Sequence, residues 1–245
     1  MPDREDPPGG HRPGGGDRLG DDGWQVLFGC RQRREPQRAH VARYWPPTDV
    51  RLDMLEEAVA IIRRLWEGGT VTRRGAHFEV DNARIYTLPE RPPPILVAAA
   101  GPKAAELAGR IGDGLISTAP NDETVQQFDQ AGGRGKPHMG QVHVLWAEEE
   151  RKARRQALEL WPNAAVPGEL GQELPMPTHF EQAAKRVTED DIAESVVCGP
   201  DPERHIAAIR EYLDAGFEQV AVHQVGPDQE GFFRFYESEV LPKLR

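Results

Sequence analysis

Four short apolar segments, each followed by a stretch with helical character, constrain the fold of this chain more than any other feature. They cover residues 95–99, 115–118, 142–146 and 219–225. Short apolar runs of this kind are typical of strands buried in a parallel sheet. Strands that alternate with helices favour parallel pairing with right-handed crossovers. The pattern predicts an α/β fold, and by itself it fits either part of a (β/α)₈ barrel or a small doubly wound sheet.

The segments between these strands carry the usual signals of helix starts and ends. Pro102 stands in the first turn of a helix that ends before Gly112, which matches the preferred positions of both residues. Prolines interrupt residues 162–200, and this pattern predicts an insertion of short helices. We expect the longer helices at about 102–111, 122–131, 148–160, 202–215 and 228–240.

A further helix and a hairpin precede the first of these strands. Apolar residues recur at helical spacing from Leu52 to Trp66, and Thr48 or Asp49 can serve as the N-terminal cap. Gly68 and Gly69 then end the helix. A strand pair with its turn at Arg74-Gly75 should follow.

The composition changes sharply near residue 45. Residues 1–23 are mostly Gly, Pro, Asp and Arg, and residues 24–44 show no clear hydrophobic period. Segments that cannot bury enough apolar surface to offset their ordering entropy stay disordered. We therefore divide the chain into a disordered segment, residues 1–44, and a folded part, residues 45–245.

The charge and the cysteine content bound the function. The net charge of −10 disfavours nucleic acid as a partner, because phosphate binding needs a basic surface. No apolar run reaches the length of a membrane span or forms a secretory signal. Two cysteines, Cys30 and Cys198, make no disulfide framework. These features predict a soluble, cytoplasmic protein, and they identify no metal site.

The ends of the predicted strands are the places to look for binding residues, because parallel α/β folds bind ligands there. The first strand leads through Ala100 and Gly101 directly into a helix, which exposes backbone N–H groups at a helix N-terminus. The other ends carry Thr118, Trp146 and His223. On these residues alone, an ordinary tight turn at Gly101 is the favoured interpretation.

Two long segments decide between the alternatives. Residues 74–118 read RGAHFEVDNARIYTLPERPPPILVAAAGPKAAELAGRIGDGLIST, and residues 198–245 read CGPDPERHIAAIREYLDAGFEQVAVHQVGPDQEGFFRFYESEVLPKLR. Both resemble the luciferase-like oxidoreductases that depend on coenzyme F420, in the branch of the glucose-6-phosphate dehydrogenases. The resemblance runs from Trp45 to Arg245. It implies a partial (β/α)₈ TIM barrel, the C-terminal half with strands five to eight.

The resemblance also implies a cofactor, a reaction and some contacts. Members of the family transfer hydride between an alcohol-type substrate and coenzyme F420, and they often form homodimers. Ala100, Gly101 and Lys103 match coenzyme-binding positions. Thr118 matches a substrate-pocket threonine, and His223 at a strand end is a second candidate for contact with a small-molecule substrate. A purely structural role for Thr118 and His223 stays open.

The departures from the family pattern concern substrate and catalysis. The positions of two lysines and an arginine that hold the sugar phosphate are Asn121, a residue near Gly171, and Ser195. A phosphate dianion needs such cations, so we expect no turnover of glucose 6-phosphate. The family's catalytic histidine and its GVGxGExLNE-like segment with a glutamate do not occur here. We therefore assign no catalytic residue in this chain.

A shift of reading frame accounts for the missing segment. Residues 23–40 read GWQVLFGCRQRREPQRAH, and codons for these residues, read one base later, can spell GRFSLGVGSGENLNEH. Residues 1–22 can likewise give a family-like peptide. We hypothesise that residues 1–44 are translated out of frame, which predicts little activity and poor solubility for this exact chain.

Two other functions remain in competition with a truncated F420-dependent enzyme. One is a flavin-mononucleotide monooxygenase of the same superfamily. The other is a non-catalytic half barrel that binds a partner, which the absence of the catalytic residues favours. The sequence does not identify the substrate or the oligomeric state.

Overall fold

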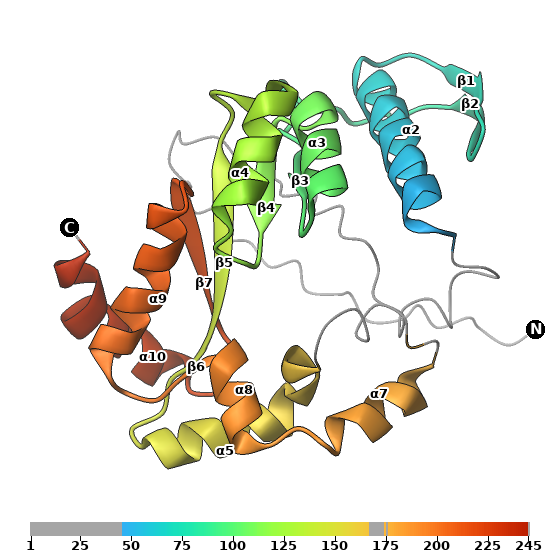
Figure 1. Ribbon diagram of the computed structural model, residues 1–245. Helices are drawn as coiled ribbons and strands as arrows, with labels where there is room; N and C mark the ends of the chain where they lie inside the picture. Colours follow the sequence, from blue (N-terminus) through green and yellow to red (C-terminus); the bar gives the residue numbers. More distant parts are fainter. Residues whose placement is uncertain (1–45, 167–173, 175, 245) are drawn as a thin grey trace, which may run out of the picture.

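The computed structural model describes residues 46–166, 174 and 176–244 (Figure 1). The predicted disorder and out-of-frame translation of residues 1–44, and the position near Gly171, lie outside these residues and stay predictions. The described part contains an α/β core, a helix and a hairpin that both precede this core in the sequence, and a group of short helices.

The core is a parallel sheet in which neighbouring strands follow one another along the chain. Every pairing in this sheet is parallel. The outer edges of the first and last strands have no strand partner within the described residues. The strands in order across the sheet are β3 (Leu96–Ala98), β4 (Gly114–Ser117), β5 (His138–Leu145) and β7 (Gln219–Gln224), and β6 (Val197–Cys198) pairs with the end of β5.

Helices follow the strands at the expected places. The helices are α3 (Pro102–Ile111), α4 (Asp122–Phe128), α5 (Glu150–Leu160), α9 (Pro202–Asp214) and α10 (Gln229–Phe235). The last three of these helices connect or follow β5 and β7. Two of the helices are extended by π-helical turns, at Asp129–Gly133 and Tyr236–Val240.

One face of the sheet packs against helices, and this distinguishes a barrel from a doubly wound sheet. Alternate strand residues, such as Val97, Leu115 and Val142, share one buried core with residues of α3, α4, α9 and α10. A doubly wound sheet would reverse its strand order and carry helices on both faces. The sequential order and the single helical face are those of consecutive units of a (β/α)₈ barrel, as the resemblance implied.

The third predicted strand begins earlier than its apolar run suggested. β5 starts at His138, four positions before Val142. The two buried positions among the added residues lack an apolar signature, because His138 is polar and Gly140 leaves room for a ring. A Cβ atom on Gly140 would lie 2.3 Å from the Cδ1 atom of Tyr212. Packing from α9 therefore replaces the side chain that a strand pattern normally shows.

The insertion after α5 lies at the carboxyl end of β5 (Figure 1). It contains a 3₁₀ turn at Pro162–Ala165 and two short helices, α7 (Pro177–Ala184) and α8 (Glu189–Ser195). Thr188 and Asp191 form a capping box at the start of α8. A second, smaller core joins α5 and α8 through Ala153, Ala157 and Ile192, so the insertion is anchored beside the strand ends.

The first described helix begins one residue earlier than the predicted caps allow. α2 spans Thr48–Trp66, and its cap position is Pro47, with no side-chain cap among the described residues. Thr48 and Asp49 are therefore inside the helix rather than before it. Arg63 attaches α2 to the core through Ile111 O and Asp113 Oδ1, both at 2.9 Å.

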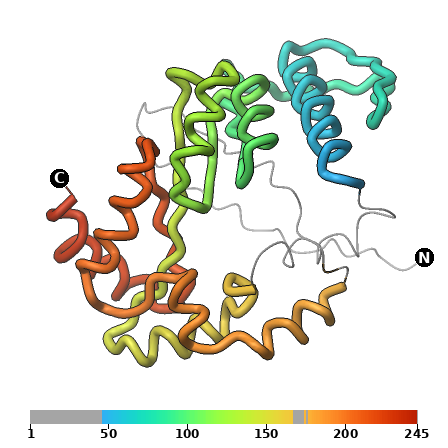
Figure 2. Tube along the Cα trace, viewed as in Figure 1, coloured from blue at the N-terminus to red at the C-terminus, as the bar shows by residue number. Residues whose placement is uncertain are grey.

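A two-stranded hairpin, β1 (Val71–Arg74) and β2 (Glu79–Ala83), lies beside α2, at the side of the molecule away from the C-terminal helices (Figure 2). Its turn is held by Glu57 of α2. The carboxylate of Glu57 is buried and accepts hydrogen bonds from the backbone N–H groups of His77 at 2.9 Å and Phe78 at 3.2 Å. In the part of the chain that the structure describes, no helix is long and apolar enough to cross a bilayer.

We expect Glu57→Ala to destabilise the fold by about 1–3 kcal/mol, because it leaves two backbone donors without an acceptor. Glu56→Ala is the matched control, since the carboxylate of Glu56 is exposed and pairs with Arg110, and exposed pairs contribute little. Urea denaturation and hydrogen exchange of the His77 and Phe78 amides measure the effect. Equal losses for the two variants would contradict this role of Glu57.

A buried histidine makes the stability depend on pH. His205 of α9 is 1% exposed, its Nε2 lies 2.9 Å from Gly199 O, and its Nδ1 lies 2.8 Å from the Tyr236 hydroxyl. The carbonyl can only accept, so Nε2 carries the proton and Nδ1 accepts from the hydroxyl. Burial disfavours the charged ring and lowers the pKa of His205.

The unfolding free energy should therefore fall as the pH drops below about 6.5. In that range the unfolded chain binds a proton at residue 205 that the folded chain does not bind, at a cost of at most about 1.4 kcal/mol per pH unit. Denaturation between pH 7 and 5, with His205→Gln as comparison, measures this slope. A wild-type slope no steeper than that of His205→Gln would refute the assignment.

Candidate functional site

The turn between β3 and α3 places backbone N–H groups at the rim of the sheet. Gly101 is the N-terminal cap residue of α3 in an extended conformation, with φ at −156°, and no described side chain caps the first turn. Pro102 follows directly and has no N–H to satisfy. The first turn of α3 therefore offers donors and the positive end of a helix dipole to a ligand.

A pocket of about 330 Å³ opens beside this turn, between it and α4. A Cβ atom added at Gly101 would meet nothing within 4 Å, so the backbone there faces open space. Asn121 contributes to the wall while its Oδ1 accepts the Thr124 N–H at 3.1 Å and caps α4. The lining residues are Ala100, Gly101, Pro102, Asn121, Glu123, Thr124, Gln126, Gln127 and Gln130.

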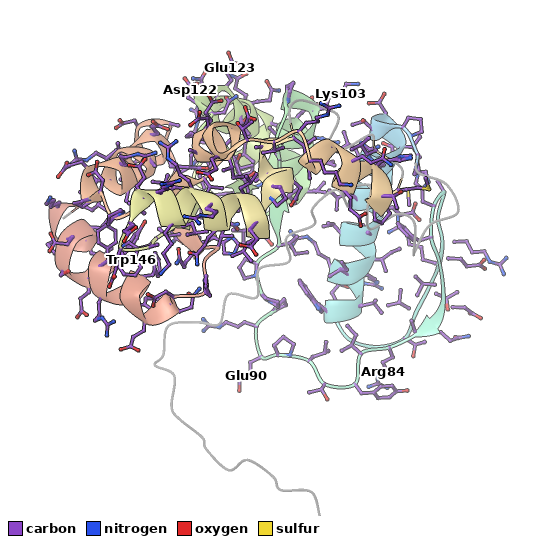
Figure 3. All side chains as sticks on the ribbon, turned by 90° about the horizontal axis from the view of Figure 1, so that it is seen from below. Arg84, Glu90, Lys103, Asp122, Glu123 and Trp146 are labelled. Carbon is purple, nitrogen blue, oxygen red and sulfur yellow. The ribbon has the colours of Figure 1, made fainter. Side chains whose placement is uncertain are left out.

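The three predicted coenzyme contacts do not all lie at this pocket. Ala100 and Gly101 line the pocket, but Lys103 does not. Its Nζ lies 2.7 Å from Asp49 Oδ1 of α2, and this hydrogen bond raises the pKa of the amine. Figure 3 shows Lys103 toward α2, apart from Asp122 and Glu123 at the start of α4.

Thr118 follows the last residue of β4 and is exposed, outside the pocket lining. The hydrogen bonds that close this strand end belong to its neighbour. Ser117 Oγ donates to Ala119 O at 3.0 Å, and the Ala119 N–H lies 3.2 Å from the same Oγ. The strand-end role considered for Thr118 is therefore filled by Ser117, and the Thr118 side chain is left at the rim.

His223 lies on β7 as part of a cluster that sequence reasoning missed. Its register partner on β5 is His143, and the two Nδ1 atoms are 3.0 Å apart. Trp161, at the end of α5, packs on both rings, with centroids 5.5 Å from His143 and 5.1 Å from His223. The signal was present in β5, where His143 stands between the buried residues Val142 and Val144.

Trp146, the other aromatic residue at a strand end, is used for packing. Its backbone N–H donates to Gln224 Oε1 at 2.9 Å, and its ring stacks on Phe235 of α10 at 5.9 Å. The ring therefore faces the helical layer; Figure 3 marks its place. Ser195, at one of the positions expected to hold a phosphate, is the last residue of α8.

A parallel barrel-type sheet, with a pocket at the carboxyl ends of its strands, is the arrangement of an α/β-barrel protein, and members of this fold class bind their ligands at that end. The sequence profile of the family described as luciferase-like monooxygenase matches residues 28–219. The chain belongs to this family.

Curated relatives are similar in sequence over most of the chain. An F420-dependent glucose-6-phosphate dehydrogenase of Microbacterium testaceum is 32% identical over 213 residues, which cover 82% of this chain and 63% of the relative. An F420-dependent hydroxymycolic acid dehydrogenase of Mycobacterium tuberculosis is 36% identical over 202 residues, 80% of this chain and 55% of the relative. The chain thus spans just under two thirds of the first relative.

Solved structures support the same fold. An F420-dependent secondary alcohol dehydrogenase, in complex with an F420–acetone adduct, matches with a TM-score of 0.72 and 30% identity, over 84% of this chain and 65% of that one. A coenzyme-F420-dependent tetrahydromethanopterin reductase of Methanopyrus kandleri matches with a TM-score of 0.58 at 22% identity, a likeness of fold.

Proposed function

We propose that this chain is an F420-dependent oxidoreductase that acts on an alcohol group. The observation that carries the proposal is the shared sequence with relatives that bear this description at 30% identity or more. The monooxygenases among the structural neighbours are only 15–19% identical to this chain, which is a likeness of fold alone. The higher identity of the F420-dependent relatives favours the deazaflavin over flavin mononucleotide as the coenzyme.

The pocket at the β3–α3 turn offers hydrogen-bond donors to a hydroxyl-rich coenzyme, although its lining carries the acid Glu123 and no cation. Gly101 leaves its backbone open to the pocket, and the first turn of α3 supplies N–H donors at a positive dipole end. Asn121 and the glutamines of α4 line the same pocket and suit hydroxyl groups. When bound, coenzyme F420 supplies the hydride-transfer chemistry.

In this proposal Ala100 and Gly101 hold the coenzyme by backbone contacts. Lys103 is a proposed third contact, which requires its amine to leave Asp49. Thr118 and His223, on the next strands of the rim, orient the substrate hydroxyl. We assign no general base among the described residues. Together with the hypothesis that residues 1–44 are translated out of frame, this predicts little activity for the 245-residue chain.

A side chain at residue 101 should block the coenzyme without disturbing the fold. We expect Gly101→Val to weaken binding of F420 at least tenfold, with a smaller loss for Gly101→Ala, since the added atoms project into open space. The thermal midpoint should stay unchanged, because φ at −156° suits any residue. Fluorescence titration with F420 and with flavin mononucleotide measures the preference.

Lys103→Met tests the proposed third contact within the same turn, and we expect it to weaken F420 binding less than Gly101→Val does. It removes the amine but leaves the pocket lining intact. Unchanged F420 affinity in Gly101→Val, or tighter binding of flavin mononucleotide by the wild type, would refute the assignment of this pocket. F420 binding that survives in Gly101→Val but fails in Lys103→Met would transfer the site to the lysine.

Glucose 6-phosphate should not be a substrate. Asn121 and Ser195 are uncharged at positions where the resemblance implies cations, and a phosphate dianion in a dry pocket needs them. Saturation-transfer spectra with glucose 6-phosphate and with propan-2-ol measure binding by this chain, and F420 reduction followed by absorbance measures turnover. Turnover of the sugar phosphate would overturn this substrate argument, while the coenzyme assignment would stand.

A further inference from the structure

We propose that His143, His223 and Trp161 form the subsite that holds the substrate's hydroxyl group, and that this subsite selects an uncharged alcohol. The inference rests on the proposed function and names the substrate class for it. It is carried by the contact between two histidines on neighbouring strands, which packing against one tryptophan holds in place.

Both histidines point away from the helical layer. Val142 and Val144 flank His143 on β5 and are buried in the core shared with the helices. Because successive strand residues face opposite sides of a sheet, His143 faces the other side, and its register partner His223 contacts it there. In a (β/α)₈ barrel this side is the interior, open at the carboxyl ends of the strands.

The separation of the two Nδ1 atoms limits how many protons the pair can hold. At 3.0 Å one Nδ1 must donate and the other must accept, because two N–H groups cannot face each other at this distance. The pair therefore carries at most one positive charge. Trp161 packs on both rings and restricts their rotation, so that this contact is kept.

The Nε2 atom of His223 is then the group that meets a ligand. It has no hydrogen-bond partner among the described residues, and it does not belong to their buried unsatisfied atoms. When His143 donates at Nδ1, the neutral His223 carries its proton on Nε2 and donates to a ligand. When a neutral His223 donates at Nδ1, its Nε2 accepts instead.

This exchange of roles suits an alcohol and its oxidised product. An alcohol hydroxyl can donate to Nε2, whereas the carbonyl of the product only accepts and needs a donor there. The aromatic wall of Trp161 suits an apolar substituent on the carbinol carbon. A phosphate dianion would find at most one positive charge on the histidine pair, and Asn121 and Ser195 add none.

The test uses the full 245-residue chain labelled with ¹⁵N-histidine. Nitrogen–proton correlation spectra follow the ring nitrogens while propan-2-ol or inorganic phosphate is added, with and without F420. We expect propan-2-ol to shift the His223 Nε2 signal and phosphate to leave it in place. His77→Asn is the control, because His77 is exposed on the hairpin turn.

Variants at residue 223 separate binding from folding. His223→Gln keeps an amide group that can donate and accept, so propan-2-ol should still give a saturation-transfer signal, whereas His223→Phe should lose most of it. Circular dichroism checks the fold of both. A signal retained in a folded His223→Phe, or a His223 resonance that responds to phosphate instead of propan-2-ol, overturns the inference.

Failure here is distinct from failure of the proposed function. If F420 binds and the His223 signal ignores the alcohol, the subsite is wrong and the coenzyme assignment stands. If the alcohol shifts His223 and F420 does not bind, the subsite stands as an alcohol site and the proposed function falls.

Discussion

The order of the parallel strands is the constraint on which the rest of the molecule depends. Because β3, β4, β5 and β7 are neighbours in the order of the chain, every crossover returns over the same face, and the helices share one core with that face. The opposite face and the carboxyl ends are left for other uses. Gly101, Thr118 and His223 lie along one rim for this reason, although they are far apart in the sequence.

Much of this architecture was predictable from the sequence, because apolar residues recur with different periods in strands and in helices. The predictions failed where a tertiary contact replaced a local signal. β5 begins at His138 rather than Val142, since Tyr212 fills the space of the side chain that Gly140 lacks. α2 begins without a side-chain cap, so a rule based on Thr and Asp placed its start one residue late.

The candidate site was predictable only in part. Ala100 and Gly101 followed from a strand–Gly–helix pattern, which is a local feature. His143 and Trp161 did not, because their meeting with His223 depends on the register between β5 and β7 and on the path of the chain after α5. Lys103 was predicted as a coenzyme contact because its position matches one in the family. That match could not show that its amine pairs with Asp49, which comes from a helix distant in the sequence.

Tyr212 gives β5 a fixed register. Its ring occupies the space above Gly140, and its hydroxyl donates to Gln141 O at 2.9 Å, so the strand is held at two adjacent positions from the helical side. A slip of one residue would bring a side chain under the ring and would turn His143 toward the apolar core. A glycine without chemistry of its own thereby sets the orientation of every polar group that β5 presents, and sequences that vary the inner face should still keep a small residue at this position.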